Sequence, residues 1–390
     1  NGGLGTGMGL DKAKSLLEVK NGDNFLDFIA KQILYLREKS KSDLRFMLMN
    51  SFSTSDDTKN YLSKYEAFQS NFDENVELLQ NKVPKIRQDN FEPAEQPLNR
   101  DDEWVPPGHG DLYAALYGSG KLQRLIDQGY KYMFVSNSDN LGATLDLRIL
   151  SHMHDKNLDF IMEVCERTES DKKGGHLARS AASGKLLLRE SAQCPKSDEG
   201  EFQNIAKHRY FNTNNLWINL PSLKAAMDGN NGMLDLPVIR NAKTVNPTDA
   251  NSTKVFQLET AMGTAITSFS NASAIVVPRE RFAPVKTCGD LLSLRSDAYV
   301  VTEDHRIVLA ESRHGTPPVI SLDDKLYKFV SGFQKLVEFG VPSLVQCNRL
   351  KIVGPVQFEN DVTLKGDVSI VNETNATKTI GAGTYSGPLQ

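Results

Sequence analysis

Apolar residues recur at helical spacing early in the chain. In the stretch "NFLDFIAKQILYLREKSKSD", Leu26, Ile29, Ile33 and Leu36 fall on one face of a helix, with charged residues opposite. The apolar run that follows at 44–52, "LRFMLMNSF", is short and typical of a buried strand. The pattern therefore predicts a helix that leads into a strand.

The same alternation continues along the chain. The stretch "GDLYAALYGSGKLQRLIDQGY" predicts a helix, whereas "KYMFVSNSDN", "LDFIMEVCER" and "ASAIVVPRE" predict buried strands. Strands that alternate with helices indicate a mainly parallel sheet. Ligands of such sheets bind at the carboxyl ends of the strands, where "MNSF" and "SNSDNLG" place polar residues.

The pattern changes beyond about Val300. Short Val, Ile and Leu steps separated by Gly and Asn, such as "VGPVQF", "DVTLKG" and "DVSIVN", replace the helical spacing. Such steps favour a small β-helix or solenoid, with an ordinary antiparallel sheet as the alternative. We therefore expect one domain at 1–300 and a C-terminal domain at 301–390.

Composition and net charge disfavour some classes of binding partner. With 390 residues, 39% hydrophobic and 24% charged, the chain is typical of a soluble globular protein. A net charge of -4 gives no long-range attraction for nucleic acid or an anionic membrane, so a phosphate ligand needs a local pocket. Apolar runs stay shorter than the roughly 20 residues of a membrane helix. We expect no nucleic-acid partner and no membrane partner.

The four cysteines lack paired spacing, which disfavours a zinc site or a disulfide framework and favours a reducing compartment; they are Cys165, Cys194, Cys288 and Cys347. In the absence of a recognisable secretory signal, the expected location is cytoplasmic. The polar tail after Asn372 slightly favours a monomer.

The first ten residues, "NGGLGTGMGL", form a glycine-dense loop that reaches Lys14. Bare backbone amides of such a loop suit a triphosphate, and a lysine nearby suits its charge. Phosphate loops normally follow a strand, so we expect that an N-terminal part of the domain is missing from this sequence.

Three charged or titratable side chains are candidates for chemistry at phosphates. Asp139 follows a predicted strand and suits magnesium, although a turn or cap aspartate has the same pattern. Lys286 lies beside a proline turn, where a solvated surface lysine is the alternative. His109 lies between glycines in "PPGHGD", where we expect a binding role, with a structural turn as the alternative.

Neutral side chains indicate a sugar. The segment "FNTNNLW" gathers Asn212, Asn214 and Asn215 in one predicted turn, which suits sugar hydroxyls or the capping of a loop. Glu190 and Gln193 in "RESAQCP" face either a sugar or solvent.

Ten segments in order resemble the eukaryotic-type UTP-glucose-1-phosphate uridylyltransferases, also called UDP-glucose pyrophosphorylases. These segments are "NGGLGTGMG", "AKS", "FLDF", "LMNSF", "PPGHGDLYAALYGSG", "FVSNSDNLGAT", "KGGHLAR", "FNTNNLW", "QLETAMG" and "PRERFAPVKT". The resemblance implies a Rossmann-like nucleotidyltransferase mixed sheet followed by a left-handed β-helix. It also implies that UTP and glucose 1-phosphate react to UDP-glucose and pyrophosphate, with Mg²⁺.

The resemblance further implies roles for individual residues. The nucleotide would be held by Leu4 and Gly5 in the loop, by Gln80 and Gly108 at the uracil, by His109 at the phosphates and by Asn137 at the uridine or the sugar. Glucose would be held by Gly175, Glu190, Asn212 and Asn214. Lys14 and Lys286 would be the catalytic lysines at the phosphates, and Asp139 the metal ligand.

Three departures from the family pattern bear on these roles. Gly7 and Met8 replace an arginine that sugar nucleotidyltransferases at large carry, which fits the UDP-glucose branch. Ala13 replaces a proline before the loop lysine, which leaves the pose of Lys14 open, and Ser138 occupies a variable site.

Other functions remain as alternatives. A UDP-sugar or UDP-N-acetylhexosamine pyrophosphorylase shares the scaffold. A dinucleotide oxidoreductase also uses a glycine loop, but the acidic ribose reader expected about 20 residues later is replaced by the apolar helix face near Ile33. A non-catalytic nucleotide-sugar sensor would have lost its charged residues, whereas Lys14, Asp139 and Lys286 are present.

Overall fold

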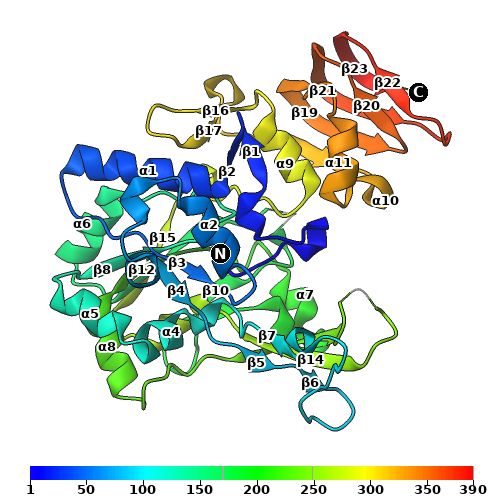
Figure 1. The fold of residues 1–390 in the computed structure, drawn as a ribbon. Coiled ribbons are helices and arrows are strands. Elements are labelled where there is room, and N and C mark those ends of the chain that lie inside the picture. The colour runs from blue at the N-terminus through cyan, green and yellow to red at the C-terminus, as the bar shows by residue number, and fades with distance from the viewer. Residues whose placement is uncertain (169–170, 248, 390) are drawn as a thin grey trace.

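A six-stranded sheet forms the centre of the computed structural model, which describes residues 1–168, 171–247 and 249–389 (Figure 1). Its strands are, in spatial order, β11 (Leu186–Arg189), β10 (His176–Arg179), β12 (Tyr210–Asn219), β9 (Phe160–Glu166) and β15 (Ala272–Val276), and β8 (Tyr132–Val135) pairs with the later half of β12. The strands expected in "KYMFVSNSDN", "LDFIMEVCER" and "ASAIVVPRE" are confirmed as β8, β9 and β15.

The expectation of a mainly parallel sheet is wrong. Only β9 and β15 pair in parallel within this sheet, while β12 runs antiparallel to β8, β9 and β10. The chain leaves β9, forms the hairpin of β10 and β11, and returns through β12 between β8 and β9. Because β12 runs against the strands on both of its sides while β9 and β15 are parallel, the sheet is mixed.

Side chains of β9 alternate between two apolar cores. Phe160, Met162 and Val164 pack under one helical layer, whereas Ile161 and Cys165 pack under the opposite layer. The first layer contains α4 (Leu112–Gly118), α5 (Lys121–Asp127) and α8 (Leu220–Asp228), and the second contains α6 (Leu147–Asp155). The one helix expected over 110–130 is therefore two helices, because the chain turns at Gly120, where φ is 71°.

The helix predicted from the opening pattern is confirmed as α1 (Phe25–Ser40). It begins with a capping box in which Asn24 accepts from the backbone N–H of Asp27, and the Asp27 carboxylate accepts from the backbone N–H of Asn24. Leu26 is fully buried, whereas Ile33 is half-buried.

A cavity of about 1090 Å³ separates β8 from β3 (Leu48–Asn50), which pairs in parallel with β4 (Glu77–Leu79). Residues of both helical layers line the cavity, including Leu116 of α4 and Ile149 of α6. Because one edge of β8 faces this cavity, all four of its residues are half-buried. The expectation that β8 is a buried strand is therefore wrong, and it is also wrong for β15, in which four residues are half-buried and Val276 is exposed.

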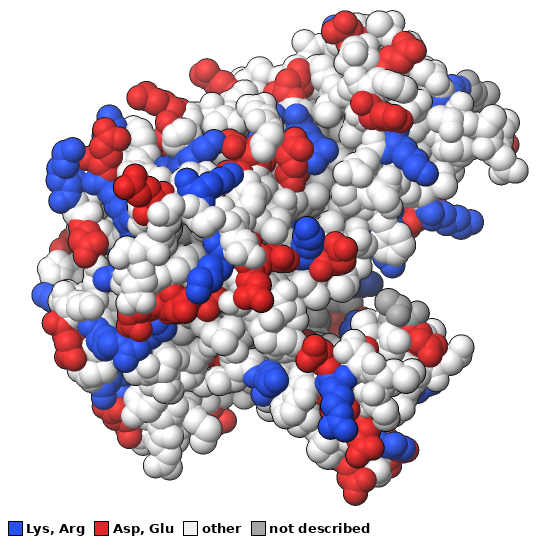
Figure 2. All heavy atoms as spheres, in the orientation of Figure 1, with Lys and Arg blue, Asp and Glu red and all other residues white. Residues whose placement is uncertain are grey.

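A second, three-stranded sheet forms the lobe at the lower right of Figure 1. It consists of β13 (Val238–Thr244), β14 (Lys254–Thr260) and β6 (Ile86–Arg87), all antiparallel. Figure 2 shows the surface hollowed between this lobe and the C-terminal part, and it shows acidic and basic side chains interspersed over this face. The remaining elements of the first 300 residues include β1 (Glu18–Lys20), β2 (Asp23–Asn24), α2 (Ser55–Leu62), α3 (Phe72–Asn75), β5 (Val83–Pro84), β7 (Trp104–Val105), α7 (Glu199–Phe202) and α9 (Cys288–Arg295).

The C-terminal part is a stack of parallel strands. One sheet has the order β18 (Val319–Ser321), β19 (Ser343–Val353), β21 (Val362–Val371) and β23 (Gly383–Leu389), and a second pairs β20 (Val356–Phe358) with β22 (Lys378–Ile380). The antiparallel alternative is wrong, since every pairing between these strands is parallel. The hairpin of β16 (Tyr299–Val301) and β17 (Ile307–Leu309), α10 (Asp324–Tyr327) and α11 (Val330–Leu336) lie before and beside the stack.

One apolar cluster joins the stack to the N-terminal elements. It contains Val19 and Phe25 together with Leu292 of α9 and Leu364 of β21. The division expected at residue 300 stays a prediction. Within the described part of the chain, no helix combines the length and apolar character needed to cross a membrane.

Candidate functional site

The Lys14 ammonium joins two segments that are distant in sequence. The glycine loop folds back so that Gly3 accepts from the backbone N–H of Lys14 at 3.1 Å. Lys14 Nζ then donates to Asp139 Oδ2 at 2.6 Å and to the backbone carbonyl of Val285 at 2.5 Å. The end of β8 and the segment after β15 therefore meet at one amine.

Asp139 lies at the rim of this junction with its side chain 22% exposed, against 20% for Lys14. Its backbone carbonyl accepts from the N–H of Val285 at 3.1 Å, so the two segments are also joined through their backbones. Among the described residues, no group of three His, Cys, Asp or Glu side chains is arranged to hold a metal ion. A magnesium ion here would need substrate phosphate oxygens and water besides Asp139, which is the coordination that this ion prefers.

His109 is held as a neutral donor. The backbone N–H of Met262 donates to His109 Nδ1 at 3.0 Å, so the ring proton is on Nε2. Burial lowers the pKa of His109 to about 4, which keeps the ring neutral at pH 7. Gly108 precedes it with φ 84°, and a Cβ there would lie 2.6 Å from the carbonyl oxygen of Thr260. The loop can therefore approach β14 this closely only with glycine at 108.

Gln80 and Asn137 border the glycine loop and the cavity. The Gln80 side chain is buried and packs against Gly2, and its backbone N–H donates to Asn50 at 2.9 Å. Asn137 and His109 both line the cavity between β3 and β8. Leu4 and Gly5 lie in the loop that turns back toward Lys14, whose side chain packs against Gly5.

The asparagines of "FNTNNLW" lie on β12, so the turn expected for them is wrong. The register of β12 against β9 shifts between Asn212 and Leu216, and Asn214 has φ 60°, which asparagine tolerates. Asn212 Nδ2 donates to Asn214 Oδ1 at 2.8 Å, and Asn214 N–H donates to Asn212 Oδ1 at 2.9 Å. At this irregularity in the pairing of β12 with β9, the amide side chains of Asn212 and Asn214 lie against each other.

Glu190 faces the same region. A Cβ at Gly175 would lie 2.6 Å from Glu190 Oε2, so the carboxylate packs directly over the Gly175 backbone. The Gly175 carbonyl accepts from the N–H of Asn212 at 3.1 Å. Burial raises the pKa of Glu190, and the positive charge of Lys286 opposes that shift. Gly175, Glu190, Asn212 and Lys286 are therefore neighbours.

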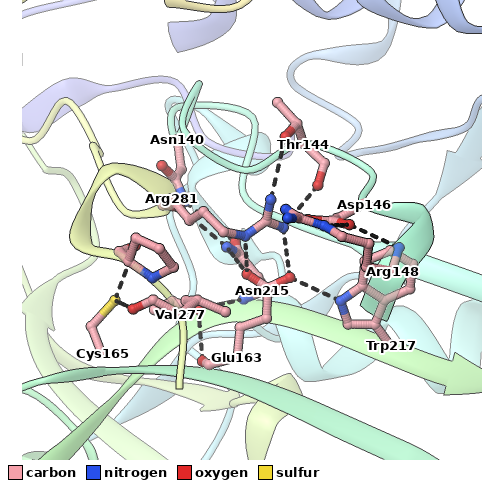
Figure 3. Close-up of polar contacts among 12 residues, drawn as sticks. Asn140, Thr144, Asp146, Arg148, Glu163, Cys165, Asn215, Trp217, Val277 and Arg281 are labelled. Carbon is pink, nitrogen blue, oxygen red and sulfur yellow. Dashed lines mark hydrogen bonds and ion pairs between the residues drawn. The ribbon is translucent and has the colours of Figure 1, made fainter. Parts of the chain in front are cut away.

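The segment that carries Lys286 is anchored by a buried ion pair (Figure 3). Arg281 Nη2 lies 2.6 Å from Glu163 Oε1, and Arg281 Nε lies 2.8 Å from Glu163 Oε2. Lys286 itself is exposed, lies 5.9 Å from the Phe282 ring centroid, and is followed by α9, whose Asp290 accepts from the N–H of Lys286.

The candidate residues thus form one connected region, although the sequence alone missed its supports. Sequence patterns do not single out the Val285 carbonyl, Thr260 or Met262, because a backbone group carries no side-chain signature. They also miss Glu163 and Arg281, since the sequence does not show whether a charged residue is buried with a partner or exposed at the surface. The segments "QLETAMG" and "PRERFAPVKT" contain four of these five supports and were the available signal.

Comparisons with known proteins agree with one another. The profile of the family described as UTP--glucose-1-phosphate uridylyltransferase matches residues 1–365. The UTP--glucose-1-phosphate uridylyltransferase of Saccharomyces cerevisiae is 44% identical over 375 residues, which cover 95% of this chain and 72% of the yeast protein.

Solved structures are similar over the whole chain. A crystal structure described as UDP-glucose phosphorylase from Trypanosoma brucei has a TM-score of 0.94 and 59% identity, covering 100% of this chain and 84% of that one. A mutant UDP-glucose pyrophosphorylase from Leishmania major, in complex with UDP-glucose, has a TM-score of 0.94 and 58% identity, covering 100% and 83%.

The mixed α/β fold that the chain shares with these structures, together with the family match, defines a nucleotidyltransferase. Within that class, the chain belongs to the UTP-glucose-1-phosphate uridylyltransferase family. The resemblance found in the sequence is confirmed.

The pKa of His109 leads to a prediction for stability. Between pH 6.5 and about 4 the unfolded chain binds a proton at His109 that the folded ring does not bind, so stability falls as the pH falls. His109→Asn keeps an acceptor near the Met262 amide and removes this titration. Urea unfolding measured from pH 7.5 to 4.5 should give a smaller loss of stability for the variant, and identical losses would contradict the assignment.

Proposed function

We propose that this chain transfers the uridylyl group of UTP to glucose 1-phosphate and releases pyrophosphate. Its family membership supports the reaction class and the substrates. The observation that carries the proposal is the convergence of Lys14, Asp139 and the segment bearing Lys286. Lys14 contacts Asp139 and the backbone of Val285, the residue before Lys286, so one amine, one carboxylate and the segment of a second amine lie together although they are distant in the chain.

The proposed step needs no protein nucleophile. A phosphate oxygen of glucose 1-phosphate attacks the α-phosphorus of UTP in line, and the bond from that phosphorus to the pyrophosphate oxygen breaks. Lys14 and Lys286 would offset the repulsion between two anionic substrates, and the neutral His109 would donate Nε2–H to a phosphate oxygen. Positioning and charge neutralisation therefore supply the rate enhancement.

Magnesium is proposed as the cofactor, with Asp139 as its protein ligand. When bound, the ion would neutralise charge on the phosphate oxygens. The Lys14 ammonium donates to one oxygen of Asp139, which holds the carboxylate at this position.

The remaining roles follow the grouping in the structure. Leu4, Gly5, Gln80, Gly108 and Asn137 would hold the nucleoside side of UTP. The neighbouring set of Gly175, Glu190, Asn212 and Asn214 would hold the sugar. Glu190 suits this role because its burial favours a firm hydrogen bond to a hydroxyl group over solvation.

A broader pyrophosphorylase for other UDP-sugars or UDP-N-acetylhexosamine is the second candidate, since selectivity among sugars depends on few contacts. The family match leaves no support for the oxidoreductase alternative. Three finer expectations remain proposals: a left-handed β-helix for the C-terminal stack, a monomer, and a cytoplasmic location. The parallel pairing of β19, β21 and β23 supports the first.

The reaction and its sugar selectivity are tested together by pyrophosphate release from UTP. We expect release with glucose 1-phosphate and Mg²⁺ to exceed release with galactose or N-acetylglucosamine 1-phosphate by at least about tenfold, because each mispaired polar contact costs of order 1.4 kcal/mol or more. Equal rates across the panel would favour the broader enzyme, and no release with any sugar would contradict the proposal.

Lys286→Ala should lower kcat by about two orders of magnitude or more, since it removes positive charge from the attacked phosphate. The fold should persist, because the ammonium is exposed and α9 is capped by the side chains of Thr287 and Asp290 and not by that of Lys286. Lys39→Ala is the matched control, as Lys39 also lies exposed over an aromatic ring, that of Tyr35 on α1. Steady-state kinetics with near-normal turnover for Lys286→Ala would refute its role.

Asp139→Asn should abolish most of the stimulation by Mg²⁺ while UTP still binds, because the amide lacks the charge that holds a hard cation. Activity measured across a magnesium titration, together with UTP binding by calorimetry, checks this. A magnesium response equal to that of the wild type would rule out Asp139 as the ligand.

A further inference from the structure

We infer that Glu163 and Arg281 are positioning residues that hold three parts of the site in register. The inference rests on the proposed function and extends it to two residues that lie beneath the substrate-facing groups. Glu163 lies in the middle of β9 and is fully buried, and the Arg281 side chain is 12% exposed (Figure 3).

The Glu163 carboxylate has four donors arranged around its two oxygens. Oε1 accepts from Trp217 Nε1 at 2.9 Å and from Arg281 Nη2 at 2.6 Å. Oε2 accepts from Arg281 Nε at 2.8 Å and from Asn215 Nδ2 at 3.0 Å. A charge buried this fully is tolerated only with its guanidinium partner and its hydrogen bonds, so the geometry of the whole group is fixed.

Each partner of this pair belongs to a segment that carries a proposed site residue. Asn215 follows Asn214 of the sugar set on β12. The backbone carbonyl of Arg281 accepts from Asn215 Nδ2 and from Asn140 Nδ2, each at 3.2 Å, and Asn140 follows Asp139. Lys286 comes five residues after Arg281.

Hydrogen bonds hold the segment between Arg281 and Lys286 at several points. Asn140 Oδ1 accepts from the N–H of Ala283 at 2.9 Å, and Lys14 donates to Val285 at 2.5 Å. A shift of Arg281 would therefore move the backbone that carries Lys286 relative to Asp139. A displacement of about 1 Å at reacting groups can cost about a hundredfold in rate.

Stability alone gives a weak reason for such a pair. Burying two charges costs solvation, and replacing a buried ion pair by neutral groups of similar volume is often harmless, whereas removing one partner is strongly destabilising. Positioning and stability can therefore be separated by comparing the single variants with the double variant.

The test uses the full chain with Glu163→Gln, Arg281→Met and the double variant Glu163→Gln/Arg281→Met. The glutamine keeps an acceptor for Trp217 and the methionine fills much of the arginine volume. The matched control is Glu166→Gln/Arg209→Met, which removes an exposed pair of the same residue types. Glu166 lies on β9, as Glu163 does, and Arg209 directly precedes β12, with its Nη2 3.0 Å from Glu166 Oε1.

We expect Arg281→Met to lower the melting temperature most and the double variant to recover most of that loss. The double variant should nevertheless show kcat reduced about a hundredfold and KM for glucose 1-phosphate raised, with KM for UTP within about threefold of the wild type. The control should match the wild type in all three constants.

Other outcomes contradict the inference in distinguishable ways. If kcat of the double variant returns together with its melting temperature, the pair is structural and the inference is wrong. If kcat falls only in proportion to the fraction of protein that is folded while both KM values are unchanged, a loss of folded protein explains the result and the inference is again wrong. If the wild type itself releases no pyrophosphate, the proposed function fails, and the inference fails with it.

Discussion

The buried ion pair between Glu163 and Arg281 is the constraint on which the site depends. It joins the middle of the central sheet to the segment after β15, and the same carboxylate accepts from Asn215 and Trp217 of β12. Because its charge is buried and its oxygens are fully engaged, the pair allows one arrangement of these segments. The loops that carry the candidate residues are therefore positioned by the inside of the sheet.

The positive charge at the candidate site comes from individual lysines, because the molecule as a whole is slightly acidic. The net charge of -4 attracts no polyanion from a distance, yet Lys14 contacts the backbone of the segment that carries Lys286, which is distant from it in the chain. Asp139 holds Lys14 in place, and burial keeps His109 a neutral donor. Such a site is arranged before a substrate arrives, which is how fixed charges and dipoles contribute most to a reaction.

Much of the fold could be predicted from local patterns, and the errors have physical causes. The helix at α1 follows from the spacing of its apolar residues, and β9 follows from its apolar run. The direction of β12 could not be predicted, because neither hydrophobicity nor turn signals record which neighbour a strand pairs with. Asn212 and Asn214 were expected in a turn, since asparagine favours turns, but cross-strand pairing with β9 places them on a bulged strand.

The sequence by itself determined the family, the segments proposed to approach the ligand and the residue types available there. Each of the ten ordered motifs is a short continuous segment, so it can be recognised without knowledge of the fold. Only the tertiary structure decided that the Val285 carbonyl receives Lys14, that Met262 sets the proton of His109, and that Glu163 is paired with Arg281. These contacts join residues more than a hundred positions apart in the chain. The free energy of a buried charge or backbone group depends on what surrounds it in space, and no local pattern contains that information.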